Sequence, residues 1–362
     1  MSSSPPQAPT VTLSALRAGH LTLPEHLFVT NADPGRCTTV PSLAFLIRHA
    51  PSRTNLVFDL GVKRDLAGYA PAMSSHIAAR QPAGAGVDGE DDAAASLCKG
   101  GFDAAADIDF VVLSHVHWDH VGTPADFANA IFLVGSGTLE VLRDGAGPRY
   151  PGELFNSDEL PWDRTREFPP VDTSSGYGGS DDGKGGGMRT EGYYERHAPK
   201  HTLVPEGSKA KSLPCMISSS ATVEENEEKG LWKPLACFPH TLDLYGDGSV
   251  YVVDAPGHIY GHVNLLVRIR QDKYVYLGGD CCHDPRILAG EKEFAEYPDS
   301  QGGGLRSVHT DTAIARNTLD RIKRFAETGV EIEGRRVEVE VVVAHDGVWA
   351  ERNRGRFWPG TF

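Results

Sequence analysis

The sequence predicts an α/β protein in which two mixed β-sheets lie face to face and helices cover their outer surfaces. Strand-like runs followed by helix-like segments occur in the first half of the chain and again in the second half, which favours two sheets with outer helices. The chain has 362 residues, of which 40% are hydrophobic, and this is enough to bury a large core.

The first half contains several elements that end near polar residues. Leu43–Ile47 and Leu56–Leu60 are apolar runs that predict two strands joined by a turn. A helix is expected over 65–80, and the apolar run Ile108–Ser114 is typical of a strand buried on both faces. The other elements expected in this half are a helix over 124–130 and a strand over 131–134.

The second half repeats this arrangement. Residues 242–254 read as strand, glycine-containing turn and strand, which predicts a hairpin. Two further strands are expected at Val263–Arg270 and Tyr274–Leu277. Apolar residues at helical spacing predict a helix over 311–328, and the last strand is expected over 337–343.

The expected domain organisation is one domain with two insertions. Residues 1–10 carry neither a basic segment nor an apolar segment, so they predict a disordered lead-in and a cytoplasmic location. Residues 11–362 then form a single domain, with insertions at about 81–107 and 144–234. The second insertion is rich in Gly and Ser, and a lid over a pocket and a disordered loop are both consistent with it.

Charge and hydropathy limit the partners of the chain. It holds 35 Lys and Arg against 49 Asp and Glu, so its net charge of −14 disfavours nucleic acid as a partner. No stretch of about 18 uninterrupted apolar residues occurs, so no membrane-spanning helix is expected. A small molecule is the expected partner, and the oligomeric state stays open, with a homodimer among the options.

A cluster of metal-binding residue types follows the strand at 108–114. His115 and His117 point the same way on an extended backbone, so they can chelate one cation together. Asp119 and His120 lie on the continuing turn, where they can address a second cation. Imidazole and carboxylate ligands suit zinc and other borderline divalent ions.

Three further candidates each follow an expected strand. His258 lies in a Pro-Gly-His turn, Asp280 follows two glycines, and His345 ends the last strand. Loops gathered along one edge of a sheet are common places for sites, so these side chains are expected near the histidine cluster.

These motifs, in this order, resemble the metallo-β-lactamase superfamily over most of the chain outside the two insertions. The resemblance implies an αβ/βα sandwich with two divalent metal ions at one edge, as Zn²⁺ or as Mn, Co or Fe. It implies one ion held by His115, His117 and His258, and another held by Asp119, His120 and His345. Asp280 would bridge both ions, and Asp59 matches a position that usually supports the ligands.

Within the superfamily, the chain looks most like the N-acyl homoserine lactonase-like branch. That branch usually has a tyrosine three residues after the bridging aspartate, and here the position is His283. An imidazole can replace the phenol as hydrogen-bond donor or general acid, or it can be a non-catalytic neighbour. Asp119 is expected to orient the nucleophile and to pass a proton to the leaving group.

The function that the resemblance implies is hydrolysis by a dinuclear metal centre. The expected reaction is the opening of a lactone by a metal-bridging hydroxide. Hydrolysis of a lactam, a cyclic carbamate or a thioester by the same centre is the first alternative. An iron-dependent oxygenase or oxidoreductase on the same ligands is the second.

Overall fold

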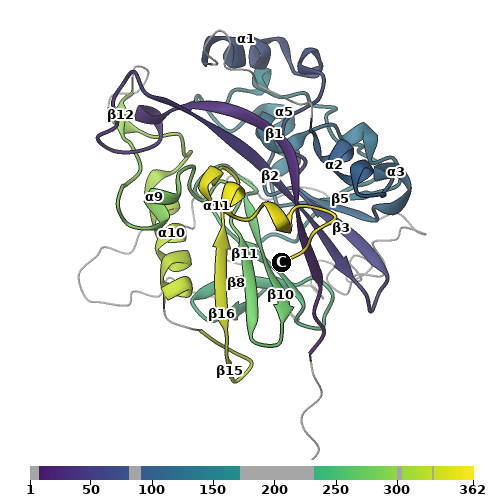
Figure 1. The fold of residues 1–362 in the computed structure, drawn as a ribbon. Coiled ribbons are helices and arrows are strands. Elements are labelled where there is room, and N and C mark those ends of the chain that lie inside the picture. Colours follow the sequence, from purple (N-terminus) through teal and green to yellow (C-terminus); the bar gives the residue numbers. More distant parts are fainter. Residues whose placement is uncertain (1–7, 81–90, 172–231, 300–303, 328–329) are drawn as a thin grey trace, which may run out of the picture.

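The first six strands form one mixed sheet whose spatial order follows the chain (Figure 1). The computed structural model describes residues 8–80, 91–171, 232–299, 304–327 and 330–362. The β1–β2 and β2–β3 pairs are antiparallel, and β3 to β6 run parallel. The strands of this sheet are β1 (Thr12–Pro24), β2 (Cys37–His49), β3 (Thr54–Phe58), β4 (Phe110–Val112), β5 (Ile131–Val134) and β6 (Thr165–Glu167).

The second sheet also has six strands, in the order β16-β11-β10-β9-β8-β7. The β11–β16 pair is parallel, and the other pairs are antiparallel. Its strands are β7 (Lys233–Leu235), β8 (Phe238–Asp243), β9 (Val250–Asp254), β10 (Val263–Arg270), β11 (Lys273–Leu277) and β16 (Glu338–Val342). Two short ribbons lie outside the main sheets, β12 (Tyr297–Pro298) with β13 (Leu305–Arg306) and β14 (Glu331–Ile332) with β15 (Arg335–Arg336).

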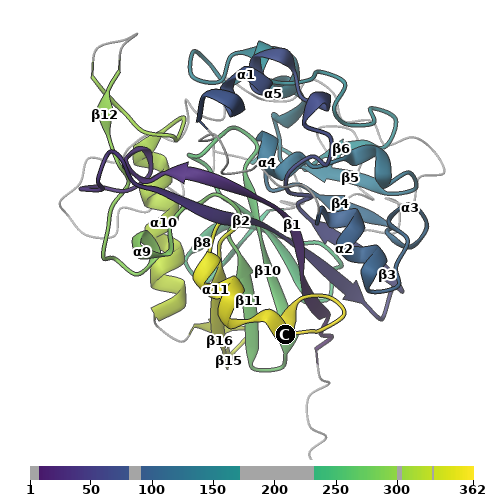
Figure 2. The same ribbon diagram turned by 45° about the horizontal axis from the view of Figure 1, so that its top comes forward.

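Helices cover the outer face of each sheet, as Figure 2 shows. Side chains of α1, α2 and α5 pack with the outer face of the first sheet, and those of α10 pack with the outer face of the second. The α-helices are α1 (Pro71–Arg80), α2 (Ala93–Lys99), α3 (Ala104–Asp107), α4 (Trp118–Val121), α5 (Thr138–Asp144), α9 (Pro285–Leu288), α10 (Thr312–Glu327) and α11 (Gly347–Arg352). Single 3₁₀ turns are η1 (Glu25–Leu27), η2 (Leu66–Gly68), η3 (Pro124–Asp126), η4 (Gly152–Leu154) and η7 (Arg354–Arg356).

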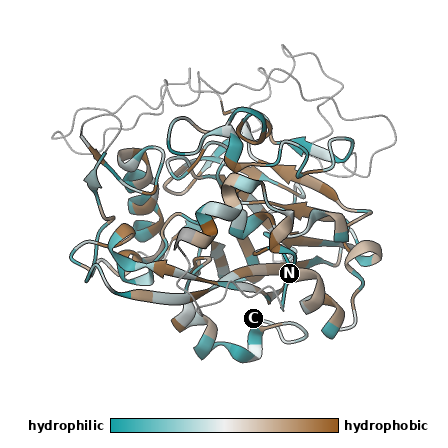
Figure 3. Cartoon of the chain, turned by 90° about the horizontal axis from the view of Figure 1, so that it is seen from above, coloured by the Kyte–Doolittle hydropathy of each residue, from teal (hydrophilic) through white to brown (hydrophobic). Residues whose placement is uncertain are grey.

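The central core lies between the two sheets. Phe58 and Val112 of the first sheet and Val252 and Leu265 of the second belong to one buried cluster, and each is at most 1% exposed. Figure 3 shows the hydrophobic colour concentrated on the strands, whereas many outer loops are hydrophilic. This burial of apolar area is the main force that holds the sheets together. The predicted αβ/βα sandwich of two mixed sheets with outer helices is confirmed.

Some local expectations differ from the structure. The helix expected over 65–80 is divided into η2 and α1, because Ala70 precedes Pro71 and a residue before proline avoids the helical region. The segment expected as a helix over 124–130 forms only the turn η3. The strand β1 was not predicted from the sequence at all.

The two stretches expected as insertions contribute regular structure at their described ends. The stretch 81–107 includes α2 and α3, and the stretch 144–234 includes the sheet strands β6 and β7. The described residues do not include 81–90 and 172–231. The prediction that the second insertion is a lid or a disordered loop therefore falls outside the described residues. Within the described part of the chain, no helix has the length and hydropathy needed to cross a bilayer.

Truncating Leu265 tests the importance of the core between the sheets. Leu265 is fully buried, so Leu265→Ala removes apolar contacts and leaves a cavity, and we expect a loss of about 2–5 kcal/mol in the free energy of unfolding. Leu305 is 65% exposed, so Leu305→Ala should change stability by less than about 0.5 kcal/mol. Urea denaturation measures both, and equal effects would contradict this account of the core.

Candidate metal centre

The metal-binding candidates come from loops at one edge of the sandwich. Strands β9, β11 and β16 run in the same direction, because β10 is antiparallel to both β9 and β11 and β16 is parallel to β11. Their carboxyl ends therefore meet at one edge, where the loops with His258, Asp280 and His345 begin. The loop after β4 carries the residues from His115 onward to the same place.

Backbone hydrogen bonds connect these loops across the two sheets. The N–H of Val263 donates to the carbonyl of Ser114 at 2.8 Å, and the N–H of Leu43 donates to the carbonyl of Ala344 at 3.0 Å. The N–H of Ala344 also donates to the carbonyl of Gly279 at 3.1 Å. The first two bonds join one sheet to the other, and the third joins two loops of the second sheet, so the site is held by both sheets.

The first cluster consists of three imidazoles and one carboxylate oxygen. Nδ1 of His117 lies 2.9 Å from Nε2 of His115 and 2.9 Å from Nε2 of His258. Oδ2 of Asp280 lies 3.7 Å from Nε2 of His115 and 3.4 Å from Nε2 of His258. Four ligand-type atoms therefore converge on one point, as in a metal site.

The second cluster shares Asp280 with the first. Oδ1 of Asp280 lies 3.1 Å from Nε2 of His120 and 3.1 Å from Nε2 of His345. Oδ2 of Asp119 lies 3.4 Å from the same nitrogen of His345. The structure thus brings together all seven side chains expected as ligands, with Asp280 between the two groups.

The burial and charge of these groups fit cations. All seven side chains are buried. Nε2 of His120 and Nε2 of His345 each lie 3.1 Å from Oδ1 of Asp280, but these three atoms make no hydrogen bond of good geometry among the described residues. Buried polar atoms without partners are unfavourable, and a metal ion would satisfy these three. The donor set of imidazoles and carboxylates suits Zn²⁺ and similar ions.

The electrostatics differ between the two clusters. Burial, together with neighbouring histidines, lowers the pKa of His115, His117 and His258 well below the usual value, so these imidazoles are neutral and offer free lone pairs. Burial also acts on His120, but the carboxylates of Asp280 and Asp59 outweigh it and raise the pKa well above the usual value. The two carboxylates therefore favour the protonated form of His120 when no metal ion is bound.

Asp59 supports the second cluster from behind. Its carboxylate accepts hydrogen bonds from the backbone N–H and the hydroxyl of Ser114, at 2.6 and 2.8 Å. Oδ2 of Asp59 also lies 2.9 Å from Nδ1 of His120, which leaves Nε2 of His120 to face Asp280. On the opposite side, Nδ1 of His345 donates to the carbonyl of Pro41 at 2.9 Å. Such contacts fix the tautomer and the orientation of ligating histidines.

His262 holds the backbone beside Asp280. Its Nε2 accepts from the N–H of Asp280 at 3.2 Å, and its Nδ1 donates to the carbonyl of Ala255 at 3.1 Å. The preceding residue, Gly279, has a φ of +45°, and a Cβ there would lie 2.9 Å from Cβ of Ser114. The glycine is thus required both by its backbone conformation and by this close approach.

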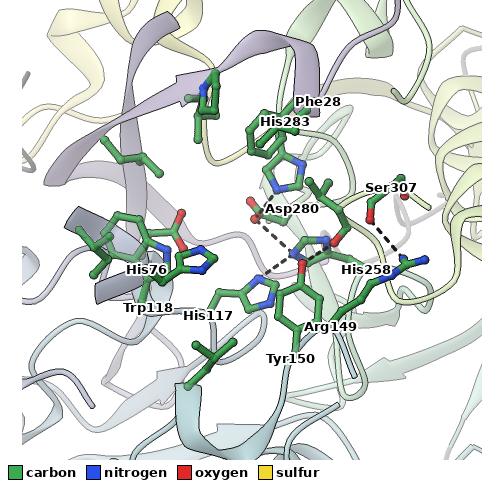
Figure 4. A pocket seen from close by; sticks show the side chains of 18 of the residues that line it. Phe28, His76, His117, Trp118, Arg149, Tyr150, His258, Asp280, His283 and Ser307 are labelled. Carbon is green, nitrogen blue, oxygen red and sulfur yellow. Dashed lines mark hydrogen bonds and ion pairs between the residues drawn. The ribbon is translucent and has the colours of Figure 1, made fainter. Parts of the chain in front are cut away.

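His283 lies on the pocket side of Asp280. Its Nε2 is 3.0 Å from Oδ2 of Asp280, and its ring packs against Phe28 with centroids 4.8 Å apart. Figure 4 shows His283 above Asp280, pointing into the space beside the metal-binding candidates. The imidazole therefore lines the pocket beside the metal-binding candidates.

His309 was missed in the sequence reading. It is fully buried, and its Nδ1 lies 3.1 Å from Nδ1 of His258. No strand was predicted before it and it belongs to none of the motifs, so only the tertiary contact reveals it. A metal ion on Nε2 of His258 would leave the proton of this ring on Nδ1, which would then donate to Nδ1 of His309.

A pocket of about 150 Å³ opens onto the first cluster (Figure 4). His117, Asp119, His258 and Asp280 form part of its lining, so the candidate ligands are accessible from it. Much of the remaining wall is apolar and comes from the end of β1, from η1 and from α1. A small pocket with apolar walls and a few convergent polar groups is typical of a site for a small molecule.

Solved structures of lactonases share this fold. One is the B. thuringiensis lactonase AiiA with N-decanoyl-L-homoserine at its active site, which matches with a TM-score of 0.58 and 15% identity over 98% of this chain and 100% of that one. Another is an N-acyl homoserine lactone hydrolase with N-hexanoyl-L-homoserine at its catalytic metal centre, with a TM-score of 0.58, 14% identity and the same coverage.

Curated relatives are similar at 26–28% identity. A cytochrome P450 monooxygenase, mpaDE′ of Penicillium brevicompactum, is 26% identical over 94% of this chain and 34% of its own length. A metallo-hydrolase of Annulohypoxylon moriforme is 28% identical over 68% of this chain and 50% of its own length. A gamma-lactamase of Fusarium pseudograminearum is 27% identical over 67% of this chain and 45% of its own length.

The chain thus spans between about a third and a half of these three relatives, so their activities belong to longer proteins. No protein-family model matches the chain. The lactonase structures align with nearly the whole chain at TM-scores of 0.58, so the similarity extends over both sheets and their outer helices. The chain therefore has the metallo-β-lactamase fold of its N-acyl homoserine lactonase neighbours.

Proposed function

We propose that the chain is a dinuclear-metal hydrolase that opens a cyclic ester. The observation that carries this proposal is the position of Asp280, whose two oxygens face two separate groups of buried ligands beside a pocket. The names of the relatives support it, because they include a metallo-hydrolase and gamma-lactamases. The fold shared with lactonases supports the choice of a lactone.

In this proposal, each cluster holds one divalent ion. His115, His117 and His258 hold the first ion, and Asp119, His120 and His345 hold the second, with Asp280 bound to both. Zn²⁺ fits this donor set best, and Mn²⁺, Co²⁺ or Fe²⁺ can occupy it as well. When bound, such a pair supplies Lewis acidity and hydroxide at neutral pH.

Two side chains handle the substrate and its protons. Asp119 lines the pocket, so its carboxylate can orient a nucleophilic water and carry a proton to the leaving group. His283 donates a hydrogen bond to the carbonyl or leaving oxygen of the substrate, since its ring faces the pocket beside Asp280. The apolar wall excludes water from the reacting bond.

A lactam is the second candidate for the bond that is broken. The matches to two gamma-lactamases favour it, and a cyclic amide has nearly the same shape as a cyclic ester. Both reactions require attack on a carbonyl carbon and protonation of the leaving atom, so the same residues serve both. An iron-dependent oxygenase would require redox-active iron, and metal analysis distinguishes it.

Metal removal and a substrate panel test the function. We expect about two equivalents of metal per chain, and hydrolysis of a lactone that is lost on chelation and restored by Zn²⁺. His117→Ala should lower both metal content and activity, because it removes one of three imidazoles from the first cluster. Undiminished hydrolysis by metal-free protein would contradict the proposal, as would oxygen uptake with bound iron. Parallel assays on lactams and thioesters identify the preferred bond.

Substitutions of His283 test its part in the reaction. His283→Phe keeps a ring against Phe28 but removes the donor, so kcat should fall by about 10²-fold or more while metal content is unchanged. His283→Tyr restores a donor and should recover part of the lost rate. Equal activity of the Phe and Tyr variants would show that His283 only fills space.

His309→Ala tests the support of the first cluster. The change leaves the Nδ1–H of His258 without its acceptor, so the affinity for the first ion should fall by about 10–100-fold. His49→Ala is the matched control, since His49 is also buried but bonds to Asp247 and stacks on Tyr245. It should lower stability without changing metal affinity. Competition with a chromogenic chelator measures the affinity, and equal affinities of the two variants would refute the role of His309.

A further inference from the structure

The described lining of the pocket contains more basic than acidic side chains. Among the described residues that line it, the only carboxylates are the metal-binding candidates Asp119 and Asp280. The other titratable groups in the described lining are four histidines, His76, His117, His258 and His283, the arginines Arg149 and Arg306, and two tyrosines. Beyond the metal centre, the described wall of the pocket therefore carries positive charge and no balancing acid.

Arg149 is anchored at one end only. Its Nη1 donates to the carbonyls of Ser307, at 3.2 Å, and of His309. Within the described residues, its Nε and Nη2 make no hydrogen bond and the guanidinium is in no ion pair. Figure 4 shows Arg149 next to Tyr150, on the side of the pocket where His258 lies. A half-buried arginine that is held by one nitrogen presents the remaining donors as a preformed fork.

Arg306, the other arginine of the pocket, has a carboxylate neighbour, although its buried Nε makes no hydrogen bond among the described residues. Its Nη1 lies 4.0 Å from a carboxylate oxygen of Asp299, and its guanidinium packs over the ring of Tyr297 at 5.3 Å. Asp299 and the ring of Tyr297 therefore compensate part of the positive charge of Arg306 within the protein. This contrast makes Arg149 the stronger candidate for binding a ligand.

The rest of the wall is suited to an apolar body. The apolar lining includes Leu21 of β1, Leu27 of η1 and Phe28, which directly follows η1. The helix α1 adds Met73 and Ile77. In Figure 4, Phe28 and Arg149 lie on different sides of Asp280. A molecule whose carbonyl lies at the metal centre would therefore extend one part toward apolar side chains and another toward Arg149.

We propose that the substrate is an acid-bearing cyclic ester or amide with an apolar body, and that Arg149 binds its anionic group and sets this specificity. The inference rests on the proposed function and names the substrate class of the same site. Arginine binds carboxylates through two parallel hydrogen bonds, and a partly buried position strengthens them relative to water. A neutral analogue would leave the guanidinium unpaired.

The test compares two probes that differ in one charge. Both are γ-lactones with a phenyl substituent, which carries a carboxylate in one probe and a carboxamide in the other. For the metal-loaded wild type, we expect kcat/KM for the acid to exceed that for the amide by at least about tenfold. In Arg149→Met, this ratio should fall to about one through loss of activity on the acid alone.

Three variants separate charge from structure. Tyr150→Phe breaks the neighbouring bond from the phenol to the carbonyl of Val308 but keeps the cation, so the acid preference should persist. Arg149→Lys should keep part of the preference, and Arg306→Met should reduce it less than Arg149→Met does. Metal content is measured for every variant, so that a fall in activity caused by lost metal ions can be distinguished from a change in substrate preference.

The outcomes distinguish this inference from the proposed function. Hydrolysis of both probes at equal rates by the wild type would overturn the inference and leave the hydrolase intact. An equal loss on both probes in Arg149→Met would also overturn it. If neither probe is hydrolysed, the proposed reaction fails for these lactones, and calorimetric binding of both probes to wild type and Arg149→Met then tests the charge preference directly.

Discussion

The buried carboxylate of Asp280 is the constraint on which the rest of the site depends. It is 1% exposed, and its pKa lies well below the usual value because His283, His120 and His345 together outweigh the effect of burial. A charge buried this deeply is stable only among compensating groups. Both sheets supply them: His120 follows β4 of the first sheet, and His283 and His345 follow β11 and β16 of the second. His262 fixes the backbone at the carboxylate.

The strands that carry the site could be predicted from the sequence because each is short, apolar and followed directly by a ligand-type residue. The strand before His115 and the one before Asp280 are of this kind. β1 was missed because Gly19, with a φ of +92°, lies at a register shift that interrupts the alternation of side chains. His309 and Arg149 could not be found, since their importance comes only from contacts with residues distant in sequence.

The candidate metal ligands and the pocket residues Arg149 and Tyr150 come from different parts of the fold. The candidate ligands follow strands of the two sheets, so their positions are tied to the core of the fold. Arg149 and Tyr150 instead lie outside the sheets, in a loop bonded to residues 307–309. Such a loop can change without disturbing the strands, which allows one centre to serve different substrates.

The distribution of the ligands over both sheets also has a mechanical consequence. His115 to His120 follow a strand of the first sheet, whereas His258, Asp280 and His345 follow strands of the second. An ion bound in either cluster is thus a cross-link between the two halves of the sandwich. The free energy of binding such an ion would add to the stability of the sandwich, so removal of metal would weaken the contact between the sheets.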